Sequence, residues 1–245
     1  IQFNMTGENK PWQDLRVRQA INLAVDRQAI IDKVYAGDAE LTGPIPPGYG
    51  DWPISQDELR NTYYATNLDK AKQLMADAGY ADGFDVTLQA IAAPRDYTQI
   101  AEIVREQLQP LNINVSVEPL ELGTFAENIG NGSFEWASTA RGMRGDPSGF
   151  VNDFAEGNGL HEVWFGDGWG NEELNRLYDE ALVTLDQEKR KELYRRIQEI
   201  IIEEVANLYT VQDKKFQVVR DRVQDMYVSY TGTNRGLREA CVRPE

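Results

Sequence analysis

Residues 84–117 read FDVTLQAIAAPRDYTQIAEIVREQLQPLNINVSV, and apolar side chains recur in them with two different periods. At both ends of the stretch apolar and polar residues alternate, as they do on half-buried strands. The alternating apolar positions are Phe84, Val86, Leu88, Ala90, Ile113, Val115 and Val117. Between them a helical stripe is formed by Ile100, Ile103, Val104 and Leu108. Strand, helix and strand over this length predict a βαβ unit with parallel strands.

Elements of both kinds continue on either side of this unit. Strands are predicted at 1–5, 134–140, 207–211 and 215–219 from their alternating or apolar runs. Helices are predicted to begin near Asp14, Asp26, Leu68, Asp146, Asn171 and Asp186, most of which are good cap residues. Two loops are predicted: residues 43–53, rich in glycine and proline, and residues 159–170, with four glycines and two tryptophans. This order of elements indicates an α/β fold.

The composition excludes several classes of function. The 245 residues carry a formal net charge of -15, which repels phosphate backbones, so nucleic-acid binding is not expected. The acidity fits either plain solubility or attraction of a cationic ligand. One histidine, His161, and one cysteine, Cys241, leave no ligand set for the usual metal sites, and no cofactor is predicted. No apolar run is long enough to span a bilayer.

Two further loops, besides 43–53 and 159–170, lie where ligands bind in open α/β sheets, beyond the carboxyl ends of strands. Loop 92–97 joins the strand at 84–91 to its helix, and loop 141–145 joins the strand at 134–140 to the helix that Asp146 begins. The free N–H groups at the start of each helix attract anionic or hydrogen-bond-accepting groups. These loops are therefore the predicted binding region.

Six residues of the two loops are candidate ligand-binding residues: Arg95, Tyr97, Arg141, Gly142, Met143 and Arg144. Arginine offers a planar fork for a carboxylate, tyrosine a flat face and a hydroxyl, and glycine a close approach to the backbone. Structural roles fit the same residues: solvated or salt-bridged arginines, a half-buried tyrosine and a gap-filling methionine. Trp136 is expected in the core, whereas Trp164 and Trp169 fit either a pocket wall or a cover over the core.

Four groups of residues follow one another along the chain. They are Phe3 and Asn4 with 14–21 (DLRVRQAI) and 24–27 (AVDR); 69–74 with 78–80, Gly83 and Phe84; 145–147 (GDP); and 171–174 through Ala181, with Asp186, Arg190, Leu193, Tyr194 and Gln198. Together they resemble the peptide- and nickel-binding proteins of ABC importers, which form extracellular solute-binding protein family 5. The resemblance runs over nearly the whole chain.

The resemblance implies a fold and a division of the chain. The fold is a type II periplasmic-binding-protein-like lobe, an α/β structure with a mixed sheet flanked by helices, and the ligand lies between two lobes. Residues 1–206 are expected to form the second lobe, with 1–5 as a crossover strand. Residues 207–245 are expected to be a return segment towards an N-terminal lobe that is missing from this chain.

The resemblance also implies a function, that of the substrate-binding component of an ABC importer and not of an enzyme. The protein would be extracytoplasmic, as a lipoprotein or free, and would present a small solute (a peptide, an oligosaccharide or an anionic metabolite) to a membrane permease. In dipeptide-binding members an arginine and a tyrosine spaced as Arg95 and Tyr97 contact the ligand, with the arginine on the peptide carboxylate. Met143 replaces the aspartate that pairs with the peptide amine, and Ala140 replaces a nearby tryptophan, so a carboxylate, sulfate or sugar acid is expected rather than a free dipeptide.

Two other functions stay open at this point. A glycosidase or another hydrolase with paired carboxylates would suit a chain with 40 acidic residues. No nucleophile motif such as G-x-S-x-G accompanies them, however. A ligand-dependent partner of a sensor or chemoreceptor is compatible with every residue of the sequence.

Overall fold

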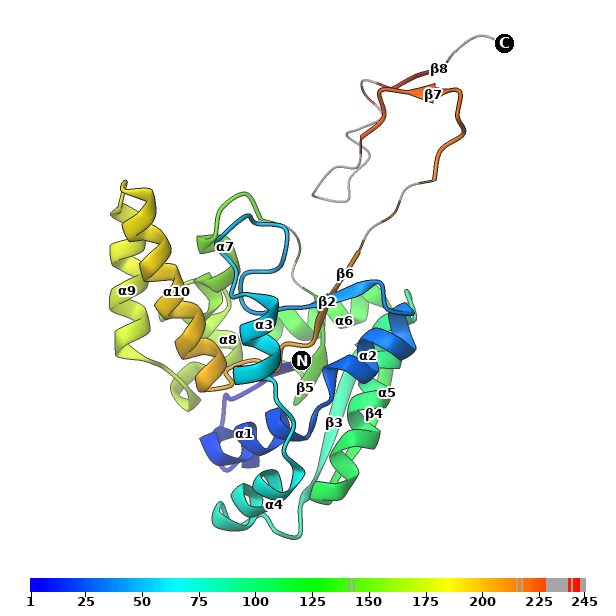
Figure 1. Ribbon diagram of the computed structural model, residues 1–245. Coiled ribbons are helices and arrows are strands. Elements are labelled where there is room, and N and C mark those ends of the chain that lie inside the picture. Colours follow the sequence, from blue (N-terminus) through cyan, green and yellow to red (C-terminus); the bar gives the residue numbers. More distant parts are fainter. Residues whose placement is uncertain are drawn as a thin grey trace.

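A four-stranded sheet forms the centre of the computed structural model (Figure 1). Its strands lie in the order β1 (Gln2–Phe3), β5 (Trp136–Ser138), β3 (Phe84–Ile91) and β4 (Ile113–Leu120). β3 pairs in parallel with β4 on one side and with β5 on the other, whereas β1 is antiparallel to β5. The predicted βαβ unit and the mixed sheet are therefore confirmed. The structure describes residues 1–140, 142, 144–214, 216, 218–227, 238 and 240–242.

Four helices lie beside the sheet, and three of them begin after a residue whose side chain caps them. The four helices are α1 (Leu15–Ala24), α2 (Arg27–Tyr35), α4 (Leu68–Asp77) and α5 (Asp96–Leu108). The side chains of Asp14, Asp26 and Asn67 accept N–H groups from the first turns of α1, α2 and α4. α5 packs on β3 and β4, α2 packs on α5, and α4 packs on α1. Gly79 follows α4 with φ +84°, the left-handed conformation in which glycine commonly ends a helix.

Two long antiparallel helices form a separate layer on one side of the molecule (Figure 1). They are α9 (Glu172–Val183) and α10 (Gln187–Glu203). Asn171 caps α9 and Asp186 caps α10, as predicted. The apolar stripe of α10 is buried, and its central residue Tyr194 is fully covered. Both predicted late helices are confirmed.

The remaining elements are short. They are η1 (Pro11–Gln13), β2 (Ala39–Leu41), α3 (Gln56–Glu58), η2 (Leu59–Tyr63), η3 (Gln109–Leu111), α6 (Leu122–Asn131), α7 (Ser148–Val151), η4 (Asn152–Phe154), α8 (His161–Trp164), η5 (Gly166–Gly168), β6 (Val211–Asp213), β7 (Val223–Gln224) and β8 (Cys241–Val242). β2 and α6 were not predicted. None of the helices in the described ranges is both long enough and apolar enough to cross a bilayer.

The stretch 159–170, predicted to be a loop, instead forms the two helical turns α8 and η5. The difference arises from packing, because Trp164 and Trp169 are both buried and their indole N–H groups are satisfied. Trp164 donates to the carbonyl of Ile129 at 2.9 Å, and Trp169 donates to the carboxylate of Glu204 at 2.7 Å. The two tryptophans therefore cover the core.

The first and last parts of the lobe run side by side. The amino group of Ile1 donates to the carbonyl of Leu208 at 2.6 Å, and the Leu208 amide donates back to Ile1 at 3.0 Å. β6 then pairs antiparallel with β2 and leads to β7 and β8, which lie apart from the rest (Figure 1). The predicted strand 207–211 is displaced to β6, and the described residues of 215–219 lie outside any strand.

The core centres on Trp136 of β5, which is fully buried as predicted. Its ring lies edge-on to the rings of Phe3, Trp12 and Phe84, with centroids 5.2, 5.6 and 6.2 Å away. These rings come from β1, η1 and β3, so one side chain joins three separate segments. Edge-on aromatic pairs stabilise beyond the apolar area that they bury.

Candidate functional site

Loops 92–97 and 141–145 leave the sheet at the same edge. β3 and β5 are parallel neighbours, with Leu88 opposite Trp136 and Ala90 opposite Ser138, so their carboxyl ends lie together. A hydrogen bond joins the bases of the two loops, since the hydroxyl of Ser138 donates to the carbonyl of Tyr97 at 3.1 Å. This is the arrangement in which α/β sheets bind ligands. Arg141 and Met143, two of the predicted site residues, lie outside the described residues.

Loop 92–97 is held firmly beneath an exposed arginine. The Ala92 amide donates to the carbonyl of Leu120 at the end of β4, at 2.8 Å, and α5 begins at Asp96. The hydroxyl of Tyr35 donates to the carboxylate of Asp96 at 3.2 Å. Burial, and then the negative charge of Asp96, raise the pKa of the Tyr35 hydroxyl. Arg95 itself is exposed, and Tyr97 is half-buried against the core.

A cavity of about 600 Å³ opens beside loop 92–97, between α2 and α5. Lys33 and Arg95 supply positive charge to its wall, and Glu102 and Glu106 supply negative charge. The other lining residues are Val34, Ala92, Thr98, Gln99, Ile103 and Pro119. Arg95 therefore borders a cavity with both polar and apolar walls, as small-molecule sites usually have.

Loop 141–145 is anchored by residues distant in sequence. Gly142 and Arg144 are both exposed. The Tyr49 hydroxyl donates to the carbonyl of Arg144 at 2.6 Å and accepts the Arg144 amide at 3.1 Å. The Tyr49 ring packs edge-on against Phe150 of α7, with centroids 4.9 Å apart. Sequence reasoning missed Tyr49, because it lies in a loop 95 residues away.

Asp146 caps the first turn of α7, as predicted. Its carboxylate also has a second partner, which was not predicted. Its carboxylate accepts the amide of Ser148 at 2.9 Å, and Pro147 already has helical angles. Both carboxylate oxygens also accept hydrogen bonds from Arg190 of α10, at 2.9 and 2.8 Å. The hydrogen bonds from Arg190, followed by that from Ser148, lower the pKa of Asp146 to about 2.

This pair makes stability depend on pH in a defined window. Because the pKa of Asp146 is lower in the folded chain than the ordinary value of about 4, its contribution is present above pH 4. It is lost as the pH falls towards 2. We expect Asp146→Asn, which keeps the cap acceptor, to lower the unfolding free energy by about 1 kcal/mol at pH 7, allowing for screening at a half-exposed carboxylate. Urea unfolding of the wild type and the variant at pH 7, 4 and 2.5 measures this loss of unfolding free energy. A loss of equal size at all three pH values would contradict the role given to the Asp146–Arg190 pair.

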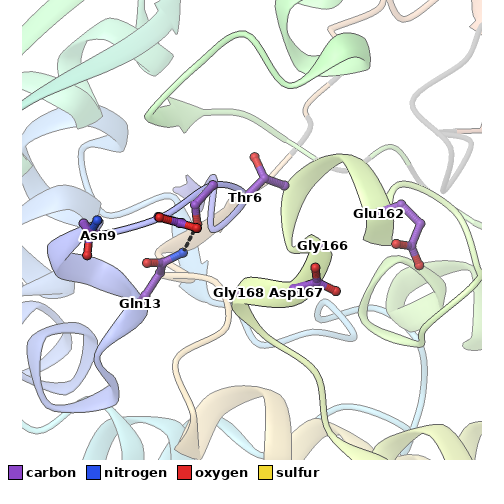
Figure 2. Close-up of a pocket in the computed structure, with 9 residues that line it drawn as sticks. Thr6, Asn9, Gln13, Glu162, Gly166, Asp167 and Gly168 are labelled. Atoms are coloured by element: carbon purple, nitrogen blue, oxygen red, sulfur yellow. Dashed lines mark hydrogen bonds between the residues drawn. The ribbon is translucent and has the colours of Figure 1, made fainter.

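A second cavity, of about 810 Å³, is formed by the turn after β1 and by η5 (Figure 2). Glu8, Glu162 and Asp167 give it an acidic wall. Gln13 closes one side by donating to the carbonyls of Met5 and Gly7, both at 2.7 Å. The described part of the chain holds no group of three or more His, Cys, Asp or Glu side chains arranged for a metal ion. Of the predicted site residues that the structure describes, Arg95, Tyr97, Gly142 and Arg144, none lines this cavity.

Comparison with known proteins now decides the family. A model of the bacterial extracellular solute-binding proteins, family 5 (middle), matches residues 1–161, about two thirds of the chain. The chain belongs to this family. Members of family 5 bind solutes and are not enzymes, so the hydrolase alternative is wrong.

Two curated relatives match nearly the whole of this chain. Di/tripeptide-binding protein 1 of Pseudomonas aeruginosa is 31% identical over 96% of this chain and 43% of its own length. The dipeptide-binding protein of Escherichia coli is 27% identical over 92% of this chain and 42% of its own. This chain thus spans less than half the length of these relatives.

Solved structures show the same likeness. The dipeptide-binding protein from Pseudoalteromonas sp. SM9913, in complex with Met-Leu, matches with a TM-score of 0.81 and 25% identity, over 99% of this chain and 47% of that one. The periplasmic binding protein AgaA from A. tumefaciens R10 also has a TM-score of 0.81, with 23% identity, over 100% of this chain and 50% of that one. The periplasmic-binding-protein-like fold of this family 5 lobe is therefore confirmed.

Proposed function

We propose that this chain is part of the substrate-binding component of an ABC importer, and that loops 92–97 and 141–145 hold a peptide-like or other carboxylate-bearing solute. The observation that carries the proposal is the junction of the two loops, where Ser138 of β5 donates to the carbonyl of Tyr97. A solute at this edge meets both loops at once. The protein would work outside the cytoplasm and pass the solute to a membrane permease.

The exposed arginines of the two loops favour a carboxylate, while Glu102 and Glu106 balance the positive charge in the wall of the cavity itself. Arg95 and Lys33 border the cavity between α2 and α5, and the exposed Arg144 lies in the other loop. Arginine binds a carboxylate through two parallel hydrogen bonds. Relatives of this chain are named for binding dipeptides and tripeptides, which end in a carboxylate. Met143 stands where dipeptide-binding members carry the aspartate for the peptide amine, so we expect the carboxylate to dominate recognition, and dipeptides serve as carboxylate-bearing probes rather than as the expected natural solute.

Exposed apolar side chains near the end of the chain favour closure by a second lobe. We assign residues 1–206 to the lobe described here and 207–245 to a segment that packs on another lobe. Beyond β6 several large apolar side chains are exposed, which suits residues that another part of the protein covers. They are Phe216, Val218, Val219, Tyr227 and Val242.

Calorimetry tests the two-lobe proposal. An equimolar pool of dipeptides is titrated into the full-length protein, refolded to remove bound solute, and into this chain alone. Because a lobe on its own offers half of the contacts and little burial, we expect it to bind at least about 100-fold more weakly. Equal affinity in the two preparations would contradict closure between lobes, and no heat from the full-length protein would contradict a peptide-like solute.

A further inference from the structure

The hydroxyl of Tyr49 satisfies both backbone polar groups of one residue in the ligand loop. It donates to the carbonyl of Arg144 and accepts the amide of the same residue, at 2.6 and 3.1 Å. One phenolic hydroxyl has a donor and acceptor lone pairs, so it can make both bonds at once. The contact thus fixes the Arg144 backbone in the way that a neighbouring strand would, although neither residue lies in a strand.

Tyr49 is in turn fastened to the helical layer. Its ring packs on Phe150, which is buried, and its carbonyl accepts the amide of Trp52 at 3.3 Å. The carbonyl of Trp52 accepts the side-chain amide of Gln198, a fully buried residue of α10, at 2.9 Å. Loop 43–53 therefore connects α10 to Arg144 of loop 141–145 through these contacts.

Helix α10 also holds the chain on the C-terminal side of Arg144. Two residues further on, Asp146 is bound by both nitrogens of the Arg190 fork. The stem of Arg144 also lies against Gly149, where an added Cβ would come within 3.0 Å of it. The Arg144 backbone is thus held from two directions by α10, while its side chain stays exposed.

We propose that Tyr49 is a positioning residue for the ligand site: it sets the backbone of Arg144 before the solute arrives and so raises affinity. The inference rests on the proposed function, because it takes loop 141–145 as part of the binding surface. A loop that is already ordered does not have to be ordered by the ligand, and the affinity is correspondingly higher.

The experiment removes one oxygen. Tyr49→Phe keeps the ring on Phe150 and loses the hydroxyl, and Tyr64→Phe is the matched control, because the Tyr64 hydroxyl donates at 2.7 Å to the carbonyl of Thr42 elsewhere. In the full-length protein we expect the Arg144 amide to exchange hydrogen about tenfold faster in Tyr49→Phe. We expect the affinity for the dipeptide pool to fall by about fivefold or more. Tyr64→Phe should change neither quantity.

The two readouts separate this inference from the proposed function. An unchanged exchange rate of the Arg144 amide in Tyr49→Phe, or the same change of that rate in Tyr64→Phe, would overturn the inference about Tyr49. So would faster exchange with undiminished affinity. If the wild-type protein binds no dipeptide, the proposed solute class fails, and the exchange of the Arg144 amide alone decides whether Tyr49 positions the loop.

Discussion

Replacing Trp136 by alanine is expected to lower the free energy of unfolding by about 3–5 kcal/mol, the usual cost of deleting a buried tryptophan. The ring is completely buried between Phe3, Trp12 and Phe84. Its indole nitrogen makes no hydrogen bond with the described residues, so the whole loss comes from packing and from the cavity left behind. The three neighbouring rings belong to different segments, which limits how far the cavity can collapse.

Denaturant unfolding followed by circular dichroism measures this loss. Trp136→Phe is the graded variant: it keeps an aromatic ring in the same place and should cost clearly less, about 1–2 kcal/mol. Leu185→Ala is the control, because Leu185 is 99% exposed in the turn between α9 and α10 and should change stability by less than about 0.5 kcal/mol. A loss below 1 kcal/mol for Trp136→Ala would show that the centre of the core lies elsewhere.

The features predicted well from the sequence are those that neighbouring residues determine. The alternation at the start of β3 and the stripe of α5 reflect burial of one face, which is encoded within a few residues of each position, although residues 88–91 of β3 are buried on both faces. The caps Asp14, Asp26, Asn171 and Asp186 likewise bond to N–H groups two or three residues away. The parallel pairing of β3 with β4 then followed from the strand–helix–strand order.

The features that were missed depend on packing between distant segments. α6 was missed although Leu122, Phe125 and Ile129 recur at helical spacing, because its two glycines weaken the helical propensity and Phe125 is its only buried residue. α8 and η5 form in a glycine-rich stretch because Trp164 and Trp169 are drawn into the core. β2 has only three residues and exists as a partner of β6. No local pattern records such contacts.

The candidate site shows the same division. The position of the two loops could be predicted, since parallel strands bring their carboxyl ends together. The residues that hold the loops could not, because Tyr49 and Arg190 lie 95 and 44 residues from the groups that they bind. A proline-rich loop and a late helix carry no local sign that they support a binding region. The roles of Arg95, Tyr97, Gly142 and Arg144 in binding stay predictions.

Arg95→Gln is expected to weaken binding of the dipeptide pool to the full-length protein by about 10- to 100-fold. A charge-assisted hydrogen bond to a carboxylate contributes about 1.5–3 kcal/mol, and glutamine keeps a polar but shorter side chain without the charge or the fork. Arg95 is exposed at the mouth of the cavity between α2 and α5, so the substitution should leave the fold intact. The matched control is Arg176→Gln in α9, because the exposed ion pair of Arg176 with Glu180 lies outside the lining of this cavity and should matter little to binding.

Calorimetry with two ligand pools gives the most direct test, one of dipeptides with a free carboxylate and one of the same dipeptides as C-terminal amides. If Arg95 receives the carboxylate at the edge where β3 and β5 end, Arg95→Gln should lose affinity for the first pool and leave the weaker binding of the second within about threefold. Equal affinity of wild type and Arg95→Gln for the free dipeptides, or an equal loss for both pools, would contradict a carboxylate site at this edge of the sheet.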